Sequence, residues 1–341
     1  MERDLARVPV TRRKALLAGA LAGAGALAAP SILRAQTRFK VKLAGTNLIS
    51  SAPIYIAREL NYFDAEGVDV EILESPSGNI SVSSLLGGSA DIAVTGYIIP
   101  FQLAEKGIRV QTICGVMMKS VYVFVARPAM DVKTNDPAAL VAALKGKRFG
   151  VSNLSSAGDT VASGVLADFG AKSDDVLKVA VGVGGTALAA LQSGAVDAMI
   201  TYEPDLTRIL AAGAGKVVLD LRSTRTEKSF SRIPSTALQA TKAWIDEHPE
   251  AAAAVVRAVA KANLTLRNDV ETSLKTMAKL YPNLSVVEIR SIYGGEHQGF
   301  YSKVSEADFD FARDMYLKIK AITNSVKYEE MTATRFSQFW T

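Results

Sequence analysis

The sequence predicts an α/β protein built from two similar lobes, each a mostly parallel sheet flanked by helices. The chain has 341 residues, of which 49% are hydrophobic, enough for about two domains. A stretch of some 50 residues repeats at an offset of 106 positions. Within each copy, β-prone runs alternate with polar loops and helical patterns, as in parallel sheets with crossover connections.

The repeat rests on one motif. Residues 85–95 and 191–201 both read L-x-x-G-x-x-D, followed by three apolar residues and a threonine. The same register continues upstream, where Gly78 matches Gly184, the L-x-x-F pattern at 60–63 matches that at 166–169, and 46–50 matches 152–156. A shared register over this length predicts two lobes on one plan.

The first copy alternates strands and helices. Apolar residues that alternate with lysines predict a strand at its start. Pro53 is typical of the first turn of a helix. Gly67 is typical of a helix end, and the alternating pattern of a strand resumes directly after it. We expect strands at 39–43, 68–72 and 91–94, with helices at 53–60 and 80–86.

The second copy has strands expected at 148–151, 177–181 and 197–200. Segments 121–125 and 235–240 interrupt the repeat and are expected to be hinge strands between the lobes. The first lobe is then expected at 38–121 plus 235–341, and the second at 126–231.

The chain beyond Lys242 has a helical pattern. Pro249 and Glu250 open an Ala-rich helix with a proline and an acid in its first turn. Ser285 and Glu288 have the spacing of a capping box. These helices are expected to support the fold by packing on the first lobe.

Residues 1–35 are expected to be an export signal. Basic residues precede an apolar stretch at 15–29, and Ala35 is a suitable cleavage position. Arg12 and Arg13 resemble a twin-arginine signal, with the general secretory route as the alternative. The stretch is shorter than the roughly 20 residues of a transmembrane helix, and no later run reaches that length. We therefore expect a soluble periplasmic protein, cleaved after Ala35.

The composition argues against several function classes. The net charge is +5, but the first 35 residues contribute +4 of it, so no basic footprint for nucleic acid remains. The single cysteine, Cys114, lies in an apolar run and is expected to be a small buried residue. The two histidines, His248 and His297, fall in the C-terminal region. We therefore expect no metal site, no cofactor and no catalytic group.

The loops that follow the strands are the candidate binding site, because ligands of open α/β sheets bind at the carboxyl ends of the strands. Many of these loop residues also precede helices, so helix capping is the alternative role for each; for 155–158 the two roles are equally supported. The candidates are Asn47, Ser50, Ser51, Ser77, Gly78, Thr95, Gly96, Tyr97, Ser152, Ser155, Ser156, Gly158, Asp159, Gly184, Gly185, Thr186, Tyr202 and Glu203.

Backbone N–H groups at helix starts suit an anionic group such as sulfonate or carboxylate. These loops hold no Arg or Lys, although Lys119 or Arg232 could reach in from the hinge. Tyr97 and Tyr202 are expected to cover the apolar part of the solute. Glu203 is expected to accept from an amine or a ring N–H, so zwitterions and nitrogen heterocycles stay open.

Three motifs resemble a known family. Residues 53–70, 144–151 and 194–204 are similar to signatures of the periplasmic nitrate/sulfonate/taurine/thiamine-precursor binding proteins. The resemblance implies a two-lobed periplasmic-binding-protein fold of type II, acting as a monomer with an ABC permease and ATPase. Tyr202 stands where the family often has Trp. Thiamine-precursor synthases share this fold, and a solute sensor would have the same sequence features; both remain alternatives to transport.

Overall fold

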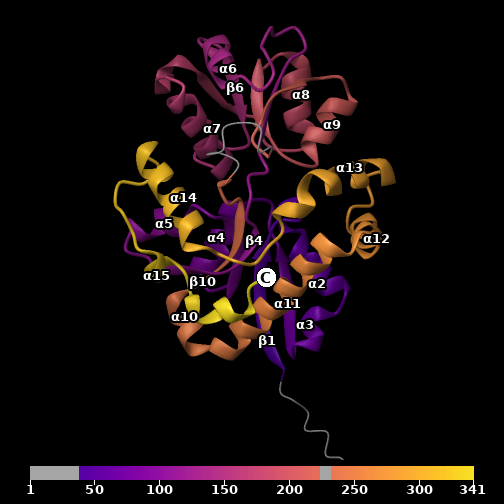
Figure 1. Ribbon diagram of the computed structural model, residues 1–341, viewed down its shortest axis with the longest axis vertical. Helices are drawn as coiled ribbons and strands as arrows, with labels where there is room; N and C mark the ends of the chain where they lie inside the picture. Colours follow the sequence, from indigo (N-terminus) through magenta and orange to yellow (C-terminus); the bar gives the residue numbers. More distant parts are fainter. Residues whose placement is uncertain (1–37, 223–231) are drawn as a thin grey trace, which may run out of the picture. The chain divides into compact units, whose positions relative to one another are not determined.

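The structure is a computed structural model that describes residues 38–222 and 232–341 (Figure 1). The predicted export signal lies outside the described residues, as do 223–231 at the end of the predicted second lobe. Arg38–Thr341 form one compact unit. In the described ranges, no helix has both the length and the apolar character needed to cross a membrane.

The first sheet has five strands, four of them running in one direction. β1 is parallel to both β2 and β3, whereas β10 is antiparallel to β3 and β4. In spatial order the strands are β2 (Val68–Glu74), β1 (Phe39–Gly45), β3 (Ile92–Gly96), β10 (Thr236–Thr241) and β4 (Val110–Met117).

The second sheet repeats this arrangement strand for strand. β6 is parallel to β7 and β8, and β5 is antiparallel to β8 and β9. The spatial order is β7 (Leu177–Ala180), β6 (Arg148–Val151), β8 (Ala198–Thr201), β5 (Val123–Ala126) and β9 (Lys216–Asp220). The predicted α/β class with two mostly parallel sheets is therefore confirmed.

The aspartates of the repeated motif have the same task in both sheets. Asp91 accepts a hydrogen bond from the backbone N–H of Lys42 at 2.7 Å, and Asp197 accepts one from Arg148 at 2.9 Å. Each carboxylate joins the turn before one strand to the neighbouring strand. The repeat in the sequence thus corresponds to a repeated structural contact.

Helices flank both sheets, and we call each sheet with its helices a lobe. Helix starts carry side-chain caps: Ser77 accepts from Ile80, and Asp136 accepts from Ala139. The first lobe contains η1 (Ile49–Ser51), α2 (Ala52–Glu59), α3 (Tyr62–Ala65), α4 (Gly78–Leu86) and α5 (Ile99–Ala104). The second contains α6 (Pro137–Leu144), α7 (Ala157–Asp168), η2 (Ser173–Asp175), α8 (Gly185–Ser193) and α9 (Asp205–Ala211), drawn from magenta to salmon in Figure 1.

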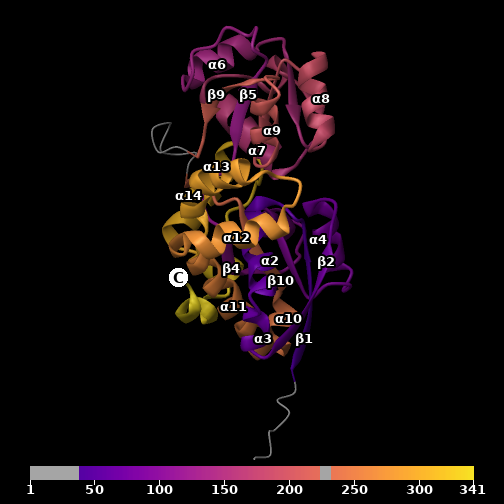
Figure 2. The ribbon, with the colours of Figure 1, turned by 90° about the vertical axis from the view of Figure 1, so that its right-hand side faces the viewer.

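The C-terminal region is helical, as predicted, and packs mainly on the first lobe. The long, Ala-rich α11 lies against α3 and β4 (Figure 2). The predicted capping box of Ser285 and Glu288 is present at the start of α13. The elements are α10 (Lys242–Glu247), α11 (Pro249–Asn268), α12 (Val270–Leu280), α13 (Val286–Glu296), η4 (His297–Gly299), α14 (Glu306–Lys318), α15 (Tyr328–Met331) and η5 (Thr334–Phe339).

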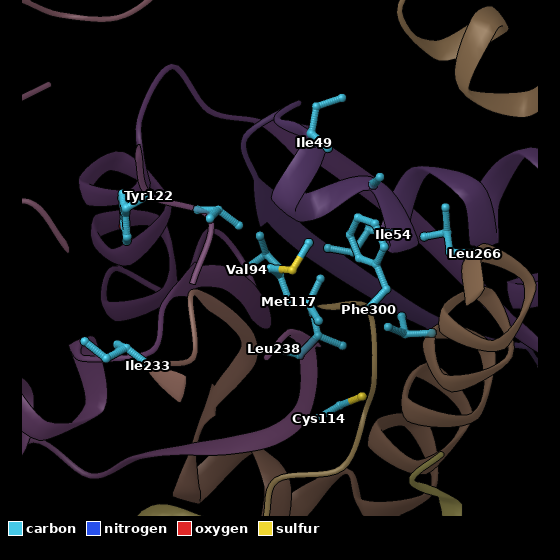
Figure 3. Close-up of a cluster of buried hydrophobic side chains, with 14 of the residues drawn as sticks. Ile49, Ile54, Val94, Cys114, Met117, Tyr122, Ile233, Leu238, Leu266 and Phe300 are labelled. Atoms are coloured by element: carbon cyan, nitrogen blue, oxygen red, sulfur yellow. The ribbon is translucent and has the colours of Figure 1, made fainter. Parts of the chain in front are cut away.

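The core of the first lobe joins its sheet to α2 and to the chain after α13. Figure 3 shows Val94, Met117 and Leu238 from three strands gathered near Ile54 and Phe300. Cys114 is fully buried there, and burial raises the pKa of its thiol. The prediction that Cys114 is a small buried residue is confirmed.

The two segments predicted as hinge strands form strands of the two sheets. Most of 121–125 forms β5 of the second sheet, and 235–240 lies almost wholly in β10 of the first. Each supplies the antiparallel strand of its sheet. The chain therefore passes from the first sheet to the second through 118–122, without a strand.

Candidate functional site

A cleft of about 420 Å³ lies between the carboxyl ends of the parallel strands of the two sheets. Both lobes contribute to its walls, and Val121, Tyr122 and Ser235, which lie near the crossings between the lobes, also line it. Ten of the eighteen predicted site residues line it: Asn47, Ser50, Ser77, Gly78, Thr95, Gly96, Ser152, Ser156, Gly158 and Tyr202. The other eight, discussed below, lie outside it.

The first-lobe wall is fixed by contacts with distant parts of the chain. The carbonyl of Leu48 accepts a hydrogen bond from Tyr281 at 3.2 Å, and that of Ser50 accepts one from Thr236 at 2.8 Å. Thr95 is hydrogen-bonded to the buried side chain of Gln239. Strand β10 and the C-terminal helices therefore hold the loop that follows β1.

The second-lobe wall is the start of α7. Ser155 has a φ of +62°, and its backbone N–H donates to the carboxylate of Asp159 at 2.8 Å. Ser156 caps the helix by accepting from the N–H of Asp159 at 3.2 Å. Ser156, Ala157 and Gly158, at the start of this helix, all line the cleft.

Two tyrosines form an aromatic wall near the connecting segments. The rings of Tyr122 and Tyr202 meet edge to face, with centroids 6.0 Å apart and planes at 79°. Burial raises the pKa of Tyr202 to about 12, partly offset by the Ser152 side chain. Burial also raises the pKa of Tyr122. Both hydroxyls therefore stay neutral at physiological pH.

Glycines allow the two lobes to approach closely. A Cβ atom on Gly96, at the end of β3, would lie 3.1 Å from the Cβ of Ala157 on α7. A Cβ on Gly158 would lie 3.2 Å from the ring of Tyr122. These two close approaches therefore depend on the absence of side chains at Gly96 and Gly158.

The chemistry of the lining is neutral. Among the described residues that line the cleft there is no Asp, Glu, Lys, Arg or His; the polar groups are hydroxyls, amides and backbone. In 38–222 and 232–341 no group of three His, Cys, Asp or Glu residues could hold a metal ion. The described lining therefore has no carboxylate to pair with an ammonium group. It does have amide N–H donors, on the side chains of Asn47, Asn79 and Asn153.

Tyr97 does not cover the cleft as predicted. It is 1% exposed, and its ring packs on Phe101 at 5.8 Å within a cluster that includes Phe309 and Tyr316 of α14. This large ring fills the core beneath α14, so it is unavailable to a solute. Ser51 is likewise fully buried, at the junction of η1 and α2.

Glu203 also lies outside the cleft, in a buried ionic cluster. It is 7% exposed and accepts from the backbone of Thr207 at 3.1 Å. Arg222 lies 3.5 Å from Glu203, 3.3 Å from Glu296 of α13 and 2.9 Å from Asp220. Burial raises the pKa of Glu203, and raises that of Glu296 to about 7. Glu203 thus joins its loop to the C-terminal helices and is not a partner for a solute amine.

The remaining predicted site residues lie in the loops and helix starts next to the cleft but do not line it. Ser155 and Asp159 shape the start of α7, as described above. The N–H of Gly184 is taken by Asp205 at 2.6 Å, and Thr186 donates to Val183 at 3.0 Å. Gly185 begins α8, beside this turn but outside the lining.

The cations and histidines considered from the sequence do not line the cleft. Arg232 pairs with Asp308 of α14 at 3.2 Å, and Lys119 does not line the cleft. His297 stacks on Tyr293, and His248 lies at the start of α11.

Sequence reasoning missed several lining residues. Asn153 was recoverable from the repeat, because it is the equivalent of Asn47 at the offset of 106. Tyr122, Ser235 and Thr236 come from segments treated only as connections. The missed residues are Thr46, Leu48, Ser75, Pro76, Asn79, Val94, Ile99, Val121, Tyr122, Asn153, Ala157, Gly182, Val183, Ser235 and Thr236.

The chain matches one protein family in sequence and many solved structures in fold. Residues 49–271 match the family described as NMT1/THI5 like. A 75-residue segment is 33% identical to YtlA of Bacillus subtilis (strain 168), which is 22% of this chain and 22% of that protein. The match thus spans about a fifth of that relative's length.

Two solved structures superpose on most of this chain. A protein from Bordetella bronchiseptica RB50 superposes with a TM-score of 0.74 at 23% identity, over 89% of this chain and 96% of that one. The alkanesulfonate-binding protein SsuA from Xanthomonas axonopodis pv. citri, bound to MOPS, superposes with a TM-score of 0.70 at 16% identity, over 86% and 97%. The fold is the periplasmic-binding-protein fold, as predicted.

Proposed function

The chain belongs to the NMT1/THI5-like family, and we propose that it is the solute-binding component of an ABC importer. It acts as a periplasmic monomer that closes two lobes over a small molecule and delivers it to a permease and its ATPase. The family assignment agrees with the resemblance seen in the motifs of the sequence. The export signal at 1–35 and the lobe boundaries near 121–126 and 231–235 are parts of this proposal.

We propose further that the solute is a small organic anion, such as a sulfonate or carboxylate. The observation that carries this is a 420 Å³ cleft without a charged residue among its described lining, into which the N-termini of α4 and α7 open. Helix N-termini favour anions through their free N–H groups and dipoles. An ammonium group would have no carboxylate partner among the described lining residues, which disfavours zwitterions.

An anion held at micromolar affinity needs donors from more than one loop. Micromolar affinity corresponds to about 8 kcal/mol, and a hydrogen bond to a charged group contributes roughly 1.5–3 kcal/mol. About four donors are therefore needed, more than one loop can supply. The alkanesulfonate-binding relative supports sulfonate as the first class to test, and the wall formed by Tyr122 and Tyr202 suits an apolar body.

A screen of solutes tests the proposal. Alkanesulfonates, arylsulfonates and carboxylates are expected to raise the melting temperature with 1:1 stoichiometry in calorimetry, whereas amines of similar shape are not. Recovery of the solute unchanged after incubation separates a binding protein from an enzyme. Stabilisation by amines alone would contradict the proposed anion specificity.

Asn47→Ala and Asn153→Ala are each expected to weaken binding of the best anion about five- to tenfold. Each removes one hydrogen bond of about 1 kcal/mol from opposite walls of the cleft. Calorimetric titration measures the change. Asn268→Ala, at the exposed end of α11, is the matched control and is expected to leave affinity unchanged. Unchanged affinity in both site variants would remove this pair from the binding surface.

A further inference from the structure

We propose that the ion pair between Lys178 and Asp159 sets the preference of the cleft for anions, although neither side chain lines it. The inference rests on the proposed function and names two residues that control its selectivity. Asp159 lies in the first turn of α7, and Lys178 lies on β7.

The carboxylate of Asp159 is held behind the cleft wall. It is 8% exposed, and one oxygen accepts from the N–H of Ser155 at 2.8 Å. The other oxygen lies 2.5 Å from the Nζ atom of Lys178, which is also hydrogen-bonded to Ser163. The carboxylate therefore shapes the loop that carries Ser156, and the lysine is its only described cationic partner.

The negative charge of Asp159 lies at the helix end that would attract an anion, and the positive charge of Lys178 offsets it. A carboxylate in the first turn of a helix is attracted to the positive end of the helix dipole and opposes its effect on an outside anion. The next residues toward the cleft, Ala157 and Gly158, are those that a bound anion would meet. Lys178 neutralises Asp159, so the helix terminus keeps its attraction for an anion while the loop keeps its hydrogen bond.

The first lobe shows that the fold does not require this pair. At the offset of 106, Asp159 corresponds to Pro53 and Lys178 to Ile72. The equivalent helix there, α2, begins without a carboxylate in its first turn. The pair is therefore specific to the second-lobe wall.

Three variants separate an electrostatic role from a structural one, with benzenesulfonate as the anionic probe and benzenesulfonamide as its neutral counterpart. Lys178→Met leaves an uncompensated negative charge and is expected to weaken benzenesulfonate binding about tenfold. Asp159→Asn keeps an oxygen for Ser155 and leaves the lysine positive, so it is expected to tighten benzenesulfonate binding several-fold. The double variant is expected to return near the wild-type affinity, and the changes in the two single variants are expected to shrink at high salt.

The control variant removes one positive charge, as Lys178→Met does, but at the amino end of a strand in the same lobe, away from the cleft. Arg148→Met, at the start of β6 and paired with Asp197, is expected to leave benzenesulfonate affinity unchanged. Equal losses for both probes, or weaker benzenesulfonate binding in Asp159→Asn, would overturn the inference while leaving the proposed function intact. A wild-type protein that binds benzenesulfonamide but no sulfonate would contradict the proposed anion specificity, and this inference with it.

Discussion

Replacing Arg222 by methionine is expected to lower the free energy of unfolding by about 3–5 kcal/mol. The guanidinium lies between Glu203 and Glu296, two carboxylates that are almost fully buried. Removing it leaves both without their shared cation in a region of low dielectric. Because Glu203 follows β8 and Glu296 ends α13, the same change also weakens the contact between the second lobe and the C-terminal helices.

The loss is expected to depend on pH, and the sign follows from Glu296. Burial raises its folded-state pKa to about 7, above the ordinary value of 4.5. Between these values the folded state holds more protons than the unfolded state, so stability falls as pH rises through this window. Without the guanidinium, which lowers this pKa, the window extends upward. The deficit of Arg222→Met should therefore be smaller at pH 5 than at pH 8.

Urea unfolding at the two pH values measures this difference. Arg313→Met is the comparison, because Arg313 pairs with the more exposed Asp310 and Asp314 on α14. Its expected loss is within about 1 kcal/mol. A deficit in Arg222→Met of the same size at pH 5 and pH 8 would show that Glu203 and Glu296 do not depend on this cation.

Gly96→Val is expected to weaken solute binding at least a hundredfold while changing stability little. A side chain at this position would meet Ala157 across the cleft and prevent the lobes from closing. The solute would then lose the contacts of the second-lobe wall, and losing about 3 kcal/mol of them corresponds to a hundredfold change. Calorimetry with the best anion gives the affinity, and small-angle scattering gives the separation of the lobes.

Gly185→Val is the matched control for this variant. A Cβ on Gly185 has no neighbour within 4 Å, and the residue does not line the cleft. Its affinity and scattering profile should match the wild type. If Gly96→Val closes over the solute as tightly as the wild type, the contact between Gly96 and Ala157 is not required for closure.

The sequence predicted the plan of the fold well because the plan is periodic and repeated. The three strands predicted in each copy and the C-terminal capping box follow from local patterns, whereas β4 and β9 were not predicted. The loops were also placed correctly at the carboxyl ends of the strands, which brings ten candidates to one cleft. What failed was the direction of individual side chains within those loops.

Tyr97 and Glu203 show why direction was not predictable. Tyr97 turns toward Phe309 on α14, a contact between segments far apart in the chain. Glu203 turns toward Arg222, 19 residues away, which in turn reaches Glu296 after a further 74. The side chain of a loop residue can point toward solvent, toward a solute or toward such distant partners, and the local sequence pattern does not determine which. Tertiary packing decides it.

The cleft combines a duplicated backbone with chemistry that differs between the copies. Asn47 and Asn153 are equivalent and present the same amide from opposite sides. Three other equivalent pairs on the lining have diverged: Pro76 is matched by Gly182, Ser77 by Val183 and Gly96 by Tyr202. The two walls therefore share a backbone plan but only part of their chemistry. Because the second wall has the ring of Tyr202 where the first has Gly96, the two walls are not interchangeable, and a solute with one polar and one apolar end has a single preferred orientation.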